Sequence, residues 1–184
     1  MQPNLDFLPG DFRISRGRGK DYARLARFHY RTGRPATFAG VWRVEYLSAS
    51  ARPRTVAVAV LSYPVPSCLP RRRALGITGS RDDELRFANQ HIRTISRVIV
   101  HPQFRALGLS SWLVNQICAE SETRYTEALA VMGRAHPFFE RAGMTRHDPG
   151  SEEGPVYYLF ERSGDDVKKC ATLNVQRATF NFQY

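Results

Sequence analysis

The alternation of apolar and polar positions predicts strands and a short helix in the first third of the chain. Residues 12–14, 37–44 and 54–63 are rich in β-branched and aromatic side chains, which is typical of strands. The last two of these runs are separated by a short polar stretch, so we expect a hairpin-like pair. Residues 20–33 place apolar side chains at helical spacing and end at Gly33, which predicts a short basic helix with a glycine cap.

The second half of the chain shows strands followed by helices. Residues 92–100 predict a strand, and residues 110–124 predict an amphipathic helix whose apolar stripe includes Leu113 and Ile117. Further along we expect a strand at 127–132, a short helix at 136–143 closed by Gly143, and a strand at 155–162. This order indicates an α/β or α+β fold with a mixed central sheet flanked by helices.

Two segments depart from this regular pattern. Residues 64–91 contain several prolines and the triplet Arg71, Arg72 and Arg73, and they are far longer than the usual connection of about 4 to 6 residues. We therefore expect a long loop in this segment, either functional or disordered. Residues 165–184 form a C-terminal extension to a domain at 1–164, and their alternating pattern predicts an additional edge strand.

Length and cysteine content narrow the class of protein. A chain of 184 residues is about one domain and can bury a core without metal or disulfide support. Cys68, Cys118 and Cys170 lack paired spacing, and the five histidines form no ligand motif, so we expect neither a disulfide framework nor a metal site. No leader and no apolar run of spanning length is visible, so we expect a cytoplasmic protein without a membrane partner.

Positive charge is concentrated near the start of the chain. Lys and Arg number 27 against 17 Asp and Glu, and the first 34 residues carry eight basic residues against three acidic ones. A clustered basic face is typical of proteins that bind a polyanion such as nucleic acid. A merely solvated surface explains the composition equally well.

One segment has the pattern of an anion site. Residues 98–111 (VIVHPQFRALGLSS) combine a strand end, a proline-containing turn, Gly108 and the start of an amphipathic helix. The first turn of a helix offers unpaired N–H groups and the positive end of the helix dipole. Small residues at Ala106, Gly108 and Ser110 would let a pyrophosphate approach the backbone closely.

This segment resembles the signature of the GNAT superfamily of acyl-CoA-dependent N-acyltransferases. The matching residues are Arg105, Gly108 and Ser110 after Val100 and Pro102, with Ser110 in place of the family's small Gly or Ala. The segment HPFFERAGM resembles the family's later helix and turn. The resemblance implies that acetyl-CoA or another acyl-CoA is the cofactor, with its thioester near residues 96–99. It also implies these cofactor-binding residues: Ile99, Val100, Arg105, Ala106, Leu107, Gly108, Leu109, Ser110 and Ser111.

The family's usual catalytic acid is missing. Many members have a Tyr before the Glu of the second motif, where this chain has Phe139. We consider His29 as a base and Tyr30 as an acid, with a packed aromatic pair at a helix end as the alternative. Ser96 beside the expected thioester and His136 beside the second motif complete the candidate catalytic residues, although the sequence favours a structural role for His136.

A branch of the superfamily shares further features with the chain. The pair His29 and Tyr30, with Ser111 early in the cofactor helix, resembles phage Mom-like DNA-adenine modifiers and the acetyltransferase-like domains fused to ABC-type ATPases. The downstream His-containing motif of the Mom-like proteins is not matched in spacing.

Three functions agree with the sequence. The first is transfer of an acyl group, acetyl by preference, from CoA to an amine on a nucleic acid. The second is a catalytically silent GNAT-like module that binds nucleic acid or a protein, and the third is an N-acetyltransferase for small molecules or proteins. The nucleic acid in the first two would be held by six arginines: Arg24, Arg27, Arg31, Arg71, Arg72 and Arg73.

Overall fold

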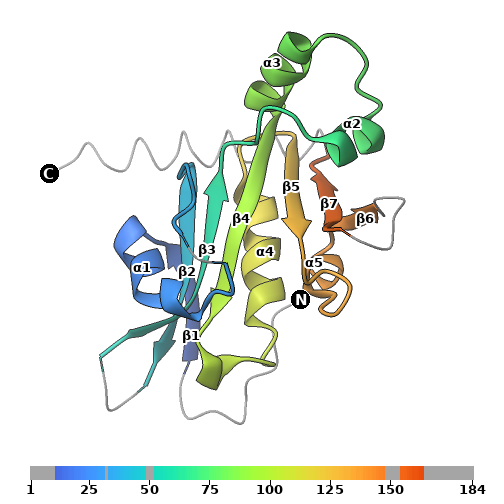
Figure 1. Cartoon of the computed structure of the whole chain (residues 1–184). Coiled ribbons are helices and arrows are strands. Elements are labelled where there is room, and N and C mark those ends of the chain that lie inside the picture. Colours follow the sequence, from blue (N-terminus) through green and yellow to red (C-terminus); the bar gives the residue numbers. More distant parts are fainter. Residues whose placement is uncertain (1–10, 32, 49–51, 148–153, 164–184) are drawn as a thin grey trace, which may run out of the picture.

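A seven-stranded mixed β-sheet forms the centre of this computed structural model, which describes residues 11–31, 33–48, 52–147 and 154–163 (Figure 1). The strand order is β1-β2-β3-β4-β5-β7-β6. Only β4 and β5 pair in parallel, and all other neighbouring strands are antiparallel. The strands are β1 (Asp11–Arg16), β2 (Gly40–Leu47), β3 (Arg54–Ser62), β4 (Ile92–Val100), β5 (Tyr125–Ala130), β6 (Thr145–His147) and β7 (Val156–Glu161).

Helices cover both faces of the sheet, and the alternation of side chains along β3 shows which helix covers which face. Val58 and Val60 pack with Tyr22 and Leu25 of the first helix. The intervening alanines of β3 lie in the other cluster, with residues of α4. Successive side chains of a strand point to opposite faces, so α1 and α4 lie on opposite sides of the sheet. The helical segments are α1 (Gly19–Leu25), η1 (Ala26–Phe28), α2 (Leu69–Leu75), α3 (Arg81–His91), η2 (Pro102–Phe104), α4 (Leu109–Glu120) and α5 (Phe138–Arg141).

The structure confirms the predicted mixed sheet, and all three expected helices form, each over fewer residues than expected. The first helix ends at Leu25 and continues only as the 3-10 segment η1, so it does not reach Gly33. Aromatic residues after Arg27 favour helix less than the residues before them, and His29 has extended backbone. Gly33 is not a helix cap, and its carbonyl accepts a hydrogen bond from the Tyr22 hydroxyl at 3.2 Å.

The interpretation of residues 64–91 as a long loop is wrong. The segment contains α2 and α3, which lie together at one end of the sheet (Figure 1). Helix α3 begins with a capping box, in which the Ser80 hydroxyl accepts from the Asp83 backbone N–H and the Asp83 carboxylate accepts from the Ser80 N–H. Helix α2 ends at Gly76, whose left-handed backbone a glycine adopts without strain. The capping box of α3 and the glycine at the end of α2 are both recognisable helix boundaries in the sequence.

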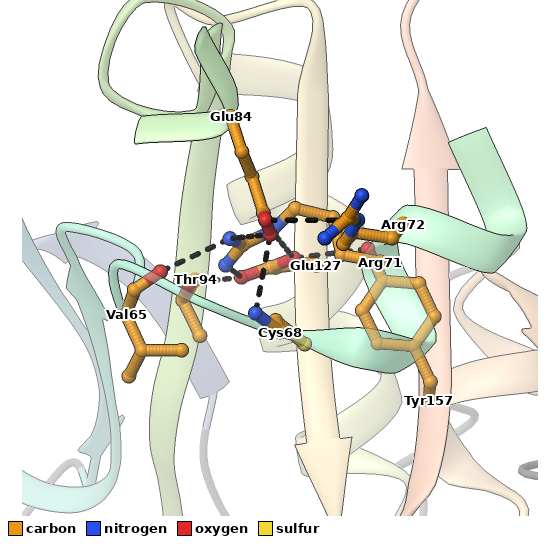
Figure 2. A network of polar contacts seen from close by, with 8 residues as sticks. All are labelled: Val65, Cys68, Arg71, Arg72, Glu84, Thr94, Glu127 and Tyr157. Carbon is orange, nitrogen blue, oxygen red and sulfur yellow. Dashed lines mark hydrogen bonds and ion pairs between the residues drawn. The ribbon is translucent and has the colours of Figure 1, made fainter. Parts of the chain in front are cut away.

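A buried ion-pair network attaches these helices to the sheet (Figure 2). The guanidinium of Arg71 donates from Nε and Nη2 to the two carboxylate oxygens of Glu127, at 2.9 and 2.8 Å. The hydroxyls of Thr94 and Tyr157 also donate to Glu127, and the Glu84 carboxylate lies 3.7 Å from Arg71 Nη1. Strands β4, β5 and β7 are thereby joined to α2 and α3.

The network fixes the protonation states of its members. Burial lowers the pKa of Arg71, but the hydrogen bonds and the charge of Glu127 outweigh it and leave that pKa raised. Burial raises the pKa of Tyr157, and the neighbouring Glu127 charge raises it further. Arg71 is therefore charged and Tyr157 is a neutral hydrogen-bond donor.

This burial corrects the assignment of Arg71 to nucleic-acid binding. Its side chain is fully buried and its charge is used inside the protein. Arg72 is partly exposed, with Nε 3.8 Å from Glu84, and Arg73 is exposed. The spacing of three adjacent arginines did not reveal which one faces the core, because the segment was not expected to be helical.

Three further expectations concern the cysteines, the C-terminal extension and membrane-spanning helices. Cys68 and Cys118 are buried free thiols, and burial raises the pKa of Cys118 to about 12. Cys170 and the expected edge strand at 165–184 lie outside the described residues. Within the described ranges, none of the helices has both the length and the apolar character needed to cross a bilayer.

Candidate functional site

Strands β4 and β5 diverge in the middle of the sheet. They pair only from Ile92 to Thr94, against Tyr125 to Glu127, whereas β4 pairs with β3 as far as Val100. The two strands separate beyond this point (Figure 1). Backbone groups of β4 from Ile95 onward, on the side facing β5, can therefore accept an extended ligand as an added strand.

A bulge at Ser96 marks the start of this divergence. Val60 pairs with Arg97, but Leu61 pairs with Ile95, so Ser96 is the extra residue of β4. Its hydroxyl lies 2.7 Å from the hydroxyl of Ser62 and 3.3 Å from the carbonyl of Val60, both on β3. The Ser96 side chain thus holds the bulge against β3, and bulges of this kind often lie next to active sites.

The turn after β4 leads into α4 with its N–H groups exposed. Gly108 has φ 77° and Ala106 has φ 65°, which is rare for a residue with a side chain. The first backbone bond of α4 runs from the Trp112 N–H to the Gly108 carbonyl at 3.1 Å. In the described part of the chain, no acceptor is found for the N–H groups of residues 109–111, which is the arrangement that binds anions.

Arg105 adds a positive charge beside this turn. Its side chain is exposed, and its Nε lies 3.4 Å from the Val100 carbonyl at the end of β4. Ser110 and Ser111 are partly exposed in the first turn of α4, and Leu109 is buried beneath it. The donor set therefore combines backbone N–H groups, hydroxyls and a guanidinium, which suits a pyrophosphate.

The second motif packs against α4 and places Phe139 in the core. The ring of Phe139 is buried and stacks on Tyr158, with ring centroids 5.0 Å apart. The side-chain amide of Asn115 in α4 donates to the Ala142 carbonyl at 3.2 Å, which joins the two helices. Phe139 has no proton to give, and His136 is exposed in the turn before α5.

The pair His29 and Tyr30 follows η1 at the α1 face of the sheet. Their rings stack at 4.6 Å between centroids, with Tyr30 exposed and His29 partly buried. The Nδ1 atom of His29 lies 3.3 Å from the Arg31 carbonyl and 3.1 Å from the Arg31 N–H. The two contacts exclude each other: Nδ1 either accepts from the Arg31 N–H or donates to the Arg31 carbonyl, and Nε2 is the proton acceptor only in the second tautomer.

His29 is kept neutral by its surroundings. Burial lowers its pKa below the ordinary value, the hydrogen bond with the Arg31 backbone raises it in part, and the charges of Arg97 and Arg31 lower it further. A neutral imidazole at pH 7 is the form that accepts a proton.

The basic residues of the first helix lie on its outer surface. Arg24, Arg27 and Arg31 are all exposed. Arg24 lies 4.0 Å from Asp21, and Arg27 lies over the ring of Phe28. Arg24 lies in α1, Arg27 lies in η1, and Arg31 follows two residues after His29.

The structure thus brings residues 99–111 together at one end of the gap, and it places His29 and Tyr30 near β4 through η1. It does not bring Arg71 or His136 to either place. The sequence interpretation missed Arg97, which shares the α1 face with Ile99 by strand alternation. The sequence feature that could have identified Arg97 is an arginine inside a strand of mainly apolar residues.

Solved structures give the same architecture. The chain is similar to a GNAT-family N-acetyltransferase (YhbS) from Escherichia coli in complex with CoA, with 11% identity, a TM-score of 0.51 and coverage of 87% of this chain and 85% of that chain. It is also similar to the ribosomal-protein-S18-alanine N-acetyltransferase from Escherichia coli (14% identity, TM-score 0.46, coverage 84% and 97%). A third similar structure is the KacTA-DNA complex (14% identity, TM-score 0.49, coverage 90% and 99%).

Neither a protein-family model nor a curated protein sequence matches the chain. The similarity to YhbS extends over most of both chains, and it includes the mixed sheet with helices on both faces. The chain therefore has the GNAT fold.

Proposed function

We propose that this protein is an acyl-CoA-dependent N-acyltransferase that uses acetyl-CoA. The observation that carries the proposal is the divergence of β4 from β5 directly before a left-handed turn and a helix N-terminus. An acyl-CoA would use these two features together, because one can hold its extended chain and the other its pyrophosphate. Acetyl-CoA would supply an activated acyl group at its thioester.

Different residues of the turn and of β4 would bind different parts of acetyl-CoA. Backbone N–H groups of Leu109, Ser110 and Ser111 would bind the pyrophosphate, with Arg105 as a neighbouring charge and Gly108 allowing close approach. Backbone groups of Ile99 and Val100, together with Ala106 and Leu107, would line the path between turn and gap. Free N–H groups of β4 would stabilise negative charge on the reacting carbonyl oxygen.

Proton transfer would fall to the pair at the end of η1. We propose that Nε2 of His29 accepts the proton of the attacking amine and that Tyr30 protonates the leaving thiolate. The absence of a hydroxyl at Phe139 supports a donor from elsewhere. Positioning of the two reactants contributes on the order of 7 to 11 kcal/mol, so turnover does not depend on the family's usual acid.

Acetyl-CoA is expected to stabilise the folded protein. A ligand selective for the folded state adds about 2.7 kcal/mol at a hundredfold excess over its Kd. Gly108→Glu should abolish the melting shift, because it places bulk and negative charge at the pyrophosphate position. Thermal unfolding with and without acetyl-CoA measures this.

Gly76→Glu is the matched control for that experiment. Gly76 also has a left-handed backbone, with φ 60°, and lies at the end of α2. It should lose stability from backbone strain to a similar extent yet keep the acetyl-CoA shift. If acetyl-CoA shifts neither the wild type nor Gly76→Glu, the cofactor assignment is wrong.

The exposed arginines of the first helix support a polyanionic acceptor, and we propose a nucleic acid, as in the Mom-like branch. Its binding should fall steeply with salt, because each neutralised phosphate contributes about −0.9 to the log-log slope on duplex DNA. Replacing Arg24, Arg27 and Arg31 by Ala should flatten the slope by up to about 3 units. Affinities of wild type and variant for DNA over a range of salt concentrations measure this.

A second triple variant separates this face from general surface charge. Arg81, Arg86 and Arg141 are exposed and lie on α3 and α5. Their replacement by Ala should leave the slope near the wild-type value. Equal slopes for all three proteins would move the acceptor to small molecules or proteins.

Phe139 also supports a catalytically silent module as the second candidate, because the ring in the core has no proton to donate. Release of CoA thiol from acetyl-CoA separates the two functions. The enzyme releases thiol in the presence of an amine, whereas the silent module binds its ligands and releases none.

A further inference from the structure

Arg97 occupies a particular place at the opening between β4 and β5. It directly follows the Ser96 bulge and pairs across the sheet with Val60. Val60 and Ile99 both belong to the cluster beneath α1 and η1. Strand alternation puts the Arg97 side chain on this same face, where η1 contacts β4. The side chain therefore lies at the α1 side of the gap, away from the turn at Gly108.

The guanidinium of Arg97 is incompletely satisfied. Its Nη1 donates to the carbonyl of Ser96, its own neighbour in the strand, at 2.7 Å. Its Nε is buried and has no hydrogen-bond partner among the described residues. Buried guanidinium N–H groups are costly to leave unpaired, so an unpaired one in a native protein requires an explanation.

Two other arginines of the sheet, Arg43 and Arg13, have acidic partners. Arg43 of β2 lies 3.3 Å from Asp21 and 3.0 Å from Glu45, and Arg13 of β1 lies 3.1 Å from Glu45. In the residues that the structure describes, no carboxylate lies within 4.0 Å of Arg97. Its positive charge is thus available to something outside the folded chain.

The groups near Arg97 make the position favourable for an anion. The charges of Arg97 and Arg31 both act on His29, and burial together with these charges lowers the pKa of His29. The imidazole is therefore neutral, and the positive charge near this place comes from Arg97 and Arg31. A guanidinium with a free edge, in a partly buried place, is well suited to a carboxylate or a phosphate.

We propose that Arg97 is the acceptor-recognition residue, binding a phosphate or carboxylate group carried by the amine that is acylated. This inference rests on the proposed acyltransferase function and names the chemical class of its acceptor. Arg97 would hold the anionic group while His29 receives the proton of the amine. It would act on the acceptor alone, because the pyrophosphate is held at the turn after β4.

The test compares three small amines on the CoA-loaded protein, in which no transfer takes place. O-phosphoethanolamine and β-alanine carry an anionic group, and ethanolamine is their neutral counterpart. We expect the wild type to bind at least one anionic amine about 10- to 100-fold more tightly than ethanolamine, as for a hydrogen bond to a charged group. In Arg97→Gln this ratio should fall to about one, and Arg97→Lys should keep part of it.

Arg93→Gln is the matched control, because Arg93 lies on the same strand but already donates to the carbonyls of Asn89 and Ile92. It should keep the wild-type ratio. The larger of the two anionic preferences shows whether the anionic group on the acceptor is a phosphate, as a nucleic acid carries, or a carboxylate. If Arg97→Gln does not fold, Arg97→Met takes its place, and the ratio of the affinities for the anionic amines and for ethanolamine is measured in that variant.

Three outcomes would overturn the proposal. A ratio near one in the wild type, or an unchanged ratio in both Arg97→Gln and Arg97→Met, would show that Arg97 binds no anionic acceptor. Loss of CoA binding in a folded Arg97→Gln protein would assign the residue to the cofactor instead. Failure of the wild type to bind CoA at all would refute the acyltransferase function itself, which is a separate result.

Discussion

Replacing Glu127 by Ala is expected to lower the free energy of unfolding by about 3 to 5 kcal/mol. The substitution removes the carboxylate that binds Nε and Nη2 of Arg71 and leaves a buried charge with only the more distant Glu84 nearby. It also takes away the acceptor for the hydroxyls of Thr94 and Tyr157. Urea unfolding of the wild type and the variant measures the difference.

Glu161→Ala is the control for this effect. Glu161 forms an ion pair with Arg124 at 2.7 Å, but both side chains are more than half exposed. Exposed pairs of this kind contribute about 0 to 1 kcal/mol. Equal losses in the Glu127 and Glu161 variants would show that the buried network does not hold α2 and α3 to the sheet.

His29→Ala is expected to lower kcat/KM by about 10² to 10⁴, the usual contribution of a general base. The acidic limb of the wild-type profile should lie below pH 6.5, because burial and the charges of Arg97 and Arg31 lower the pKa of His29. Activity is then retained as pH falls through 6.5 and is lost only as His29 takes up its proton. Release of CoA thiol from acetyl-CoA with an amine acceptor, followed over pH, measures both effects.

Two further variants control for structural effects at this position. Tyr30→Phe keeps the ring that stacks on His29 and removes only the hydroxyl, so it should lower kcat without moving the acidic limb. His91→Ala changes an exposed histidine of α3 and should have wild-type activity. Both His29→Ala and Tyr30→Phe should keep the acetyl-CoA melting shift. If His29→Ala and Tyr30→Phe both turn over at the wild-type rate, these two residues form only a packed aromatic contact and take no part in catalysis.

The sheet and the turn at Gly108 were predictable because each depends on local signals. Strand residues from Ile92 to Val100 alternate and branch at Cβ, and a glycine before an apolar helical stripe marks the start of α4. The divergence of β4 from β5 has no such local signal. It arises from pairing across the sheet, which no local pattern specifies.

Arg71 and Arg97 show why other features of the structure were not predictable. Arg71 appeared to belong to an exposed basic triplet, but its partner Glu127 lies 56 positions away on another strand. Arg97 was missed, although it is a charge inside an apolar strand, because its missing partner becomes visible only when the neighbouring elements are in place. When possible partners lie far apart in the sequence, the sequence alone shows neither that Arg71 has a partner nor that Arg97 lacks one.

The central claim is that acetyl-CoA binds along the free edge of β4 and at the turn that follows it. Amide hydrogen exchange with and without saturating acetyl-CoA tests this most directly, because it reports on individual stretches of backbone. We predict slower exchange in residues 95–100 and 106–111, with no change in β2 on the far side of β3. Protection confined to other segments, or none in either stretch, would contradict the account.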